Sequence, residues 1–156
     1  MGQQQLLLVI LVTIIVGIAT VVAINTFGTA ADSANVDAVV IDAAQISSAA
    51  QGYYMKPAML GGGSRSFEGV TFNDFAFPAA GISDDGLVAQ NENGYYELVG
   101  TTTANAQEFT LQACAISNDG YVPGTIDPDT RVLTPGICGI PVRTSTVSEN
   151  SYTSLF

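Results

Sequence analysis

Residues 6–24, LLLVILVTIIVGIATVVAI, place the strongest constraint on how this chain folds. Sixteen of these nineteen positions are apolar, none is charged, and no charge of either sign precedes Asp32. At about 1.5 Å of rise per residue, such a helix crosses most of the apolar core of a bilayer. A cleaved secretory signal would carry a basic stretch before the apolar run and small residues after it. Because the basic stretch is missing, we expect the segment to be retained.

The chain has 156 residues, enough for one small domain plus an extension. Fourteen acidic residues stand against four basic ones, a formal net charge of −10. This balance argues against binding nucleic acid through phosphate neutralisation and against docking on anionic lipid through a basic patch. The acids predict a self-repelling surface, and the chain is expected to have no nucleic-acid partner.

A second helical pattern follows the apolar segment. Its apolar positions recur with helical spacing and define one face: Val36, Val39, Val40, Ala43, Ile46 and Ala50. Asp32, Asp37 and Asp42 are predicted to point away from that face. Pro57 predicts that the helix ends near Met55. We therefore expect one long helix, with an apolar half over residues 1–28 and an amphipathic half over residues 29–56.

The rest of the chain reads as a connecting loop over residues 57–93 and a sheet domain over residues 94–156. The loop contains the glycine run Gly61–Gly63, expected to be flexible, and a phenylalanine-rich stretch, 66–78, expected to be one strand or an irregular apolar arm. Strands are predicted at Gly94–Val99, Phe109–Ile116, Arg131–Thr134 and Cys138–Thr144, with the tail Thr144–Phe156 as an exposed arm. The predicted fold class is α+β: a long N-terminal helix packed on a small antiparallel β-sheet.

The two cysteines, Cys114 and Cys138, lie too far apart in sequence for a CxxC motif. In an exported chain, an even pair of cysteines most simply forms one disulfide. The alternative is a pair of free buried thiols in a cytosolic protein. The N-terminal segment favours the disulfide.

The residues needed for common catalytic sites are missing. Without histidine, the chain has no Ser-His-Asp or Cys-His arrangement and no histidine-ligated zinc, and no CxxCH motif attaches haem. We expect neither enzymatic activity nor a cofactor. Asp119, Asp127 and Asp129 are weak calcium candidates, because they cluster between the cysteines. The alternative for these aspartates is turn formation, since Asp-Gly and Asp-Pro are common in turns.

With an uncharged apolar N-terminal helix, an amphipathic continuation, a connecting loop, an antiparallel sheet and a disulfide late in the chain, this sequence resembles the type IV pilins. The resemblance implies a subunit held in the inner membrane before assembly, which pilus assembly machinery then places in an extracellular surface filament. Its partners would be copies of itself in a helical homopolymer. The residues expected to mediate assembly are Met1, Gln3, Gln4, Gln5, Leu6, Leu7, Leu8, Ile10, Leu11, Ile14, Ile15, Ile18 and Val22.

The chain departs from the family pattern at its N-terminus. The family leader is usually basic and its removal leaves an N-methylated residue, so Met1 is expected to be the mature end rather than part of a very short leader. Counted this way, Gln5 stands where most of the family has glutamate. An amide cannot neutralise an amine, but it can donate and accept hydrogen bonds. We therefore expect Gln3, Gln4 and Gln5 to satisfy buried N-termini through amide contacts between subunits.

The family often has a helix-breaking proline near position 22, where this chain has Val22. Local flexibility is instead expected at Gly17, at Thr20 and in the stretch 25–29, which contains Gly28.

The sequence thus predicts the major pilin of a type IV-like pilus. One alternative is a pseudopilin of a secretion system. Another is an extracellular binding domain anchored in a membrane by residues 6–24. The absence of a basic flank argues against the anchor, because anchors usually need that charge for orientation.

Overall fold

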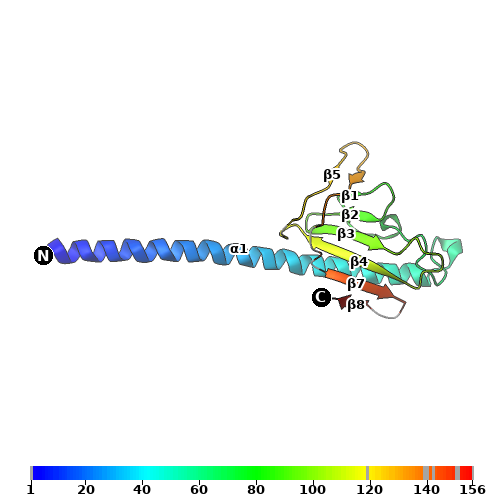
Figure 1. The fold of residues 1–156 in the computed structure, drawn as a ribbon, viewed down its shortest axis with the longest axis horizontal. Coiled ribbons are helices and arrows are strands. Elements are labelled where there is room, and N and C mark those ends of the chain that lie inside the picture. Colours follow the sequence, from blue (N-terminus) through cyan, green and yellow to red (C-terminus); the bar gives the residue numbers. More distant parts are fainter. Residues whose placement is uncertain (1, 119, 139–140, 142, 150–151, 156) are drawn as a thin grey trace. The chain divides into compact units, whose positions relative to one another are not determined.

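The computed structural model in Figure 1 describes residues 2–118, 120–138, 141, 143–149 and 152–155. Two of the residues singled out above, Met1 and Asp119, lie outside this set. The chain divides into two units, residues up to Ala34 and residues from Asn35 onward, which we call the N-terminal unit and the head. Helix α1 (Gly2–Met55) contributes to both units, and each unit is described on its own.

A six-stranded antiparallel sheet forms the larger part of the head. The order of its strands is β1-β2-β3-β4-β7-β8, and β5 and β6 form a separate two-stranded sheet. The strands are β1 (Gly81–Ile82), β2 (Val88–Gln90), β3 (Gly94–Val99), β4 (Glu108–Ala115), β5 (Thr125–Ile126), β6 (Leu133–Thr134), β7 (Arg143–Ser148) and β8 (Tyr152–Leu155). With α1 packed on this sheet through its head residues, the α+β fold class is confirmed.

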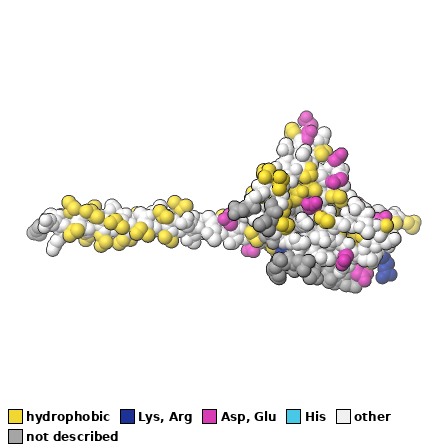
Figure 2. Space-filling model, viewed as in Figure 1, with side chains coloured by type: hydrophobic (Ala, Val, Ile, Leu, Met, Phe, Trp, Pro, Cys, Tyr) yellow, Lys and Arg dark blue, Asp and Glu magenta, His cyan; other side chains and the backbone are white. Residues whose placement is uncertain are grey.

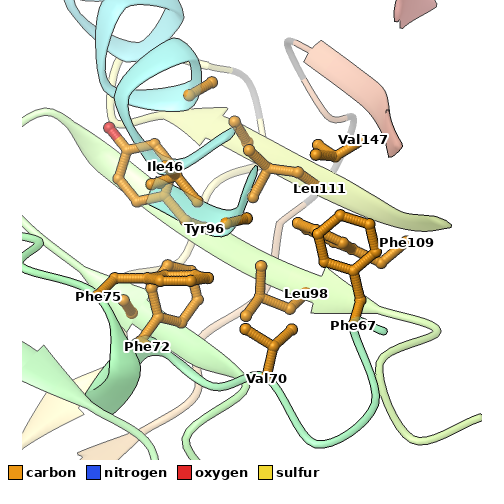
Figure 3. Close-up of a cluster of buried hydrophobic side chains, with 14 of the residues drawn as sticks. Ile46, Phe67, Val70, Phe72, Phe75, Tyr96, Leu98, Phe109, Leu111 and Val147 are labelled. Atoms are coloured by element: carbon orange, nitrogen blue, oxygen red, sulfur yellow. The ribbon is translucent and has the colours of Figure 1, made fainter. Parts of the chain in front are cut away.

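The core of the head lies between α1 and the sheet. Four of the six predicted stripe positions, Val39, Ala43, Ile46 and Ala50, are fully buried, and the other two, Val36 and Val40, are half-buried. Every second side chain of the central strands points into this core, because successive side chains of a strand point to opposite faces of the sheet. Figure 3 shows the strand residues Tyr96, Leu98, Phe109, Leu111 and Val147 in the same cluster as Ile46. The sheet therefore covers the amphipathic half of the helix.

The phenylalanine-rich stretch 66–78 forms an irregular arm rather than a strand. It contains a short 3₁₀ helix, η2 (Phe72–Asp74), which begins with a reciprocal capping box between Thr71 and Asp74. Phe67 and Phe72 are almost fully buried. The ring centroid of Phe67 lies 5.1 Å from that of Phe109 in β4. The arm therefore completes the core.

The sheet differs from the sequence prediction in the connecting segment and near the C-terminus. The strand predicted at Cys138–Thr144 lies partly outside the described residues, and the observed strand β7 begins at Arg143. The segment expected only to connect helix and sheet contains β1 and β2, which pair with each other and with β3. The tail from Thr144 onward was predicted to be an exposed arm, and this is wrong. Residues 143–148 form β7 against β4, with Ser145 and Val147 at 0% exposure, and β8 pairs with β7. Apart from Arg143, the sequence of β7 consists of small polar residues and one valine. It therefore lacks the hydrophobic alternation by which a half-buried strand is recognised.

Helix α1 ends at Met55, as predicted, and a loop caps its last turn. The carbonyl oxygen of Tyr53 accepts a hydrogen bond from the N–H of Gly63 (2.9 Å), and that of Tyr54 accepts one from the N–H of Arg65 (2.8 Å). These bonds satisfy carbonyls that a helix end leaves without partners. The glycine run predicted to be flexible thus has a specific place in the structure. It brings the backbone of residues 63–65 against the helix end.

Candidate assembly surfaces

The apolar segment of the N-terminal unit is exposed along its whole length. Every residue from Gly2 to Ala34 is exposed, and the large aliphatic side chains of residues 6–24 expose between 46% and 67% of their area. The helix is long and apolar enough to cross a membrane, judged by length and composition. Figure 2 shows hydrophobic side chains along this segment. Leaving each such side chain in water costs about 1.5–3 kcal/mol, so the segment needs an apolar partner.

The predicted assembly residues belong to this exposed surface. They are Leu6, Leu7, Leu8, Ile10, Leu11, Ile14, Ile15, Ile18 and Val22. The side chains of Gln3, Gln4 and Gln5 are exposed in the first turns of the same helix. The first N–H groups of a helix have no partner within it, and a glutamine amide oxygen can accept from such a group.

Serine and threonine hydroxyl groups of the N-terminal unit donate hydrogen bonds to backbone carbonyl oxygens of the same helix. Thr13 donates to the carbonyl oxygen of Ile10 (2.8 Å) and Thr20 to that of Val16 (2.8 Å). Thr26, Thr29 and Ser33 each donate to the carbonyl oxygen four residues earlier, at 2.9–3.0 Å. Such bonds remove most of the cost of placing a hydroxyl in an apolar environment. These bonds are a feature that the sequence prediction missed, although serine and threonine inside an apolar helix commonly form them.

The expected sites of flexibility are helical. Gly17 and Gly28 both lie within α1, and an added Cβ at either position would meet no atom within 4 Å. Neither glycine is therefore required by packing inside one chain. Any role in loosening the helix, or in close approach by a neighbour, stays a prediction.

Inside the head, Asp42 fixes α1 to the turn between β2 and β3. Its Oδ2 atom accepts hydrogen bonds from the Tyr96 hydroxyl (2.7 Å), Asn91 Nδ2 (2.8 Å) and Asn93 Nδ2 (2.9 Å). The prediction that Asp42 points away from the packed face is wrong. Its partners lie 49 to 54 residues later in the chain, so helical periodicity alone could not identify them.

The environment of two neighbouring tyrosines raises their pKa values. Burial raises the pKa of Tyr96, and the hydrogen-bonded carboxylate of Asp42 raises it further. On the opposite face of β3, burial raises the pKa of Tyr95 to about 12, with the Glu97 carboxylate acting in the same direction. Both phenols are therefore neutral at physiological pH and belong to the packing of the head.

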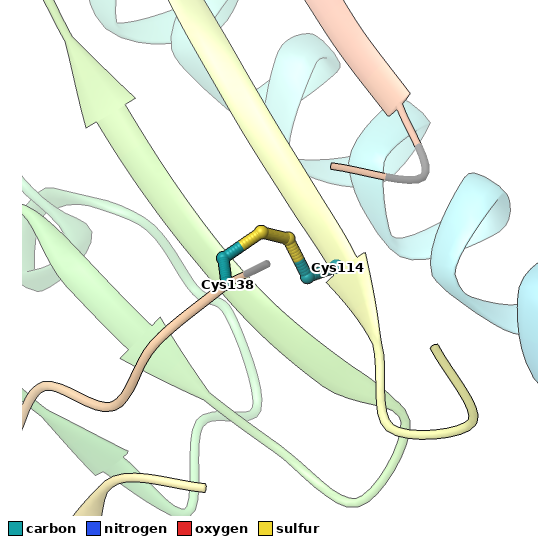
Figure 4. The surroundings of a disulfide bond; sticks show 2 residues. All are labelled: Cys114 and Cys138. Carbon is teal, nitrogen blue, oxygen red and sulfur yellow. A yellow bond between two sulfur atoms is a disulfide. The ribbon is translucent and has the colours of Figure 1, made fainter. Parts of the chain in front are cut away.

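The predicted disulfide joins Cys114 at the end of β4 to Cys138, 24 residues later, with their Cα atoms 5.9 Å apart (Figure 4). Cys114 is fully buried in a second hydrophobic cluster with Val88, Tyr95 and Leu133. This cluster lies on the face of the sheet opposite α1, because Tyr95 and Cys114 alternate with residues of the main core. The disulfide thus ties the segment that contains β5 and β6 to the back of the sheet.

The aspartates proposed as calcium candidates have a turn role where the structure describes them. Asp127 Oδ1 accepts hydrogen bonds from the backbone N–H groups of Asp129 (2.8 Å) and Thr130 (3.1 Å). The N–H groups of Thr130 and Asp129 lower the pKa of the Asp127 carboxyl. Asp119 lies outside the described residues, and among those that are described no three metal-ligating side chains come together. The geometry of Asp127 matches the turn alternative.

The fold defines an α+β protein in which one long helix both supports a sheet and carries an uncovered apolar segment. Comparisons with protein-family models, with curated proteins and with solved structures find no match to this chain.

Proposed function

We propose that this chain is the major structural subunit of a type IV-like extracellular filament and that it polymerises through residues 6–24. The observation that carries the proposal is a single helix, uncovered and apolar in one unit and buried by a sheet in the other. A helix that is apolar on every side needs lipid or copies of itself around it. A heterologous contact repeated with a non-closing rotation produces a helical fibre.

The proposed life of the subunit has two stages. The apolar segment first lies in the inner membrane, and assembly machinery then moves it into the core of the fibre beside identical segments. The internally bonded hydroxyls of Thr13, Thr20 and Thr26 suit both environments. The function is mechanical, with no catalytic turnover, and the head forms the fibre surface.

Helical reconstruction of fibres assembled from this subunit tests the proposal directly. Residues 6–24 of neighbouring copies should pack together in the fibre core. Ile14→Asp should abolish fibres, because a buried unpaired carboxylate is costly. The matched control, Val99→Asp on the head surface, should still assemble.

The outcome that contradicts the proposal is equally specific. If wild-type subunits stay monomeric in detergent and form no fibres with the assembly machinery present, the membrane-anchored binding domain becomes the better assignment. Scarce, short fibres beside an active secretion system would instead favour the pseudopilin.

A further inference from the structure

The chain enters β3 from the preceding turn through Asn93-Gly94, the one Asn-Gly pair in the sequence. In such a pair, the backbone nitrogen of the glycine can attack the side-chain Cγ of the asparagine, because glycine has no side chain to block the approach. A succinimide ring forms and ammonia leaves. Water then opens the ring to aspartate or isoaspartate. This pair is therefore the position at which an asparagine of this chain most readily loses its amide.

The fold requires both residues of the pair. Gly94 is the first residue of β3, and a Cβ there would overlap the carbonyl oxygen of Cys114 in β4. Asn93 joins the turn to α1, since its Nδ2 atom donates to Asp42 Oδ2 (2.9 Å) and its carbonyl oxygen accepts from Asn35 Nδ2 (2.9 Å). Contacts to the sheet and to the helix therefore keep a reactive pair at this turn.

Hydrogen bonds engage both reacting groups in the folded head. Ring closure needs the Asn93 side chain to turn toward the Gly94 nitrogen, but its amide donates to Asp42 instead. An ionised carboxylate only accepts hydrogen bonds, so it fixes the amide nitrogen on its side. The attacking nitrogen is engaged as well, because Gly94 N–H donates to Asn91 Oδ1 (3.0 Å). Both bonds must break before the two groups reach the aligned geometry that attack requires.

Solvent reaches this turn. Asn93 is half-buried and lines an open hollow of about 390 Å³ together with Asn91, Glu92 and residues 78–80. The hollow admits the water that opens the succinimide. The folded head thus restrains the first step of the reaction without excluding the reactant of the second.

Either product disturbs the contact between α1 and the sheet. Aspartate at position 93 places a second carboxylate within hydrogen-bond distance of Asp42 and removes the amide protons between them, so that like charges repel. Isoaspartate also adds one carbon to the backbone of the turn, which displaces the register between β2 and β3. In both cases Asp42 loses a donor and gains a repulsive neighbour.

We propose that Asn93 is a self-modification site, which deamidates through attack by the Gly94 nitrogen when the turn opens, and that Asp42 restrains this reaction in the folded head. The Gly94 N–H proton and the Asn93 amide group leave together as ammonia. The oxygen of the new carboxyl group comes from water. Because ammonia is lost, the step is irreversible and limits the lifetime of the contact between α1 and the sheet. The site lies in the head and does not depend on the proposed filament function.

The rate of amide loss at Asn93 tests the site and its restraint. The full chain is incubated in detergent at mildly alkaline pH, and peptide mass spectrometry follows the conversion with time. Asp42→Ala should speed the conversion about tenfold, the effect of losing one hydrogen bond to a charged acceptor. Wild type unfolded in urea should convert at least about as fast as this variant, since unfolding removes the same bond. The matched control is Phe67→Ala, which weakens the core without touching the turn and should leave the folded-state rate unchanged.

A substitution that copies the product provides a second measurement. Asn93→Asp should lower the urea concentration at which half of the heads unfold. Adding Asp42→Asn should recover most of that loss, because the amide at position 42 then donates to the carboxylate at position 93. Asn73→Asp, at an exposed asparagine in η2, should leave the midpoint unchanged.

Each opposite outcome overturns a stated part of the proposal. No conversion at Asn93 even in urea overturns the site itself. Equal acceleration by Asp42→Ala and Phe67→Ala overturns the restraint by Asp42, because global unfolding would then control the rate. An unchanged midpoint in Asn93→Asp overturns the effect on α1. These measurements need no fibres, so their failure is distinguishable from failure of the filament proposal.

Discussion

Asp42 shows how one side chain fixes the position of a helix on a sheet. Its carboxylate is the common acceptor for a buried phenol and two amides, and the two amides lie in the turn that joins β2 to β3. Replacing it with alanine leaves these donors without their partner. Asp42→Ala should therefore lower the free energy of unfolding of the head by about 3 kcal/mol, and Asp42→Asn by about 1 kcal/mol.

Urea denaturation of the detergent-held chain, followed by circular dichroism, measures this effect. Asp37→Ala is the matched control, since Asp37 is an exposed aspartate on the same helix and its loss should change stability little. Equal losses for Asp42→Ala and Asp37→Ala would contradict the role given to Asp42.

The tyrosines of β3 predict how the head responds to alkali. The folded pKa of Tyr95, about 12, is above its unfolded value of 10.0. The folded state therefore binds the phenol proton of Tyr95 more tightly than the unfolded state does. The stabilisation that comes from this tighter binding is complete below pH 10 and is lost as the pH rises from 10 to 12. Tyr95→Phe should reduce that loss by about 1–2 kcal/mol. Urea denaturation of wild type and Tyr95→Phe at pH 8 and pH 11.5 measures this loss. If the free energy of unfolding falls by the same amount between the two pH values in both proteins, the role given to Tyr95 is wrong.

At the scale of elements, the end of α1 depends on a close approach of backbone that only glycine permits. A Cβ at Gly63 would overlap the Ser66 carbonyl oxygen and lie 2.8 Å from the Tyr53 ring. Gly63→Ala should destabilise the head by about 2 kcal/mol. Gly52→Ala, within the same helix and with open space around it, should stabilise by about 0.5–1 kcal/mol. Thermal unfolding followed by circular dichroism compares the two, and a stabilising Gly63→Ala would contradict the capping role.

The disulfide stabilises a part of the head that is distinct from the main core. Cys114 and Cys138 join a loop whose residues pack in the second cluster, while α1 packs in the first. The double replacement Cys114→Ala/Cys138→Ala should cost about 3 kcal/mol on the chain-entropy estimate. Hydrogen exchange should speed up first at the β5–β6 pair, Ile126 and Leu133. Equal acceleration in β3 and β4 would mean that the two clusters unfold as one.

The elements also show what the sequence can reveal about this fold. The bounds of β3 and the end of α1 were predicted correctly, because a continuous β-favouring run and a proline mark them locally. The short strands β1 and β2 carry too few residues for a period to emerge. In β7, serine and threonine occupy positions where a hydrophobic residue would reveal the buried face.

The candidate assembly surface was predictable to a similar extent. Composition alone identifies residues 6–24, since no folded head could bury so many aliphatic side chains on all sides of one helix. Exposed apolar side chains of the head such as Met59 and Ile137 were not predictable, because their exposure depends on how much the surrounding loops leave uncovered.

At the scale of the whole molecule, the apolar segment and the head have separate energetics. Residues 6–24 are all exposed and contribute nothing to the core of the head, whereas Phe67 is fully buried between Tyr54 and Phe109. Ile14→Asp should therefore change the free energy of unfolding of the head by less than about 0.5 kcal/mol, even where it abolishes fibres. Phe67→Ala should lower the same quantity by about 3–5 kcal/mol.

Urea denaturation of both variants in detergent, beside wild type, measures this independence. A large loss of head stability in Ile14→Asp would contradict this independence. It would show that the apolar segment supports the head although its side chains are exposed. If the independence holds, the loss of fibres in Ile14→Asp reports on contacts between copies and not on a misfolded subunit. A polymer whose subunits join through a segment outside their own core can change that segment's surroundings, from lipid to fibre, without refolding the surface it displays.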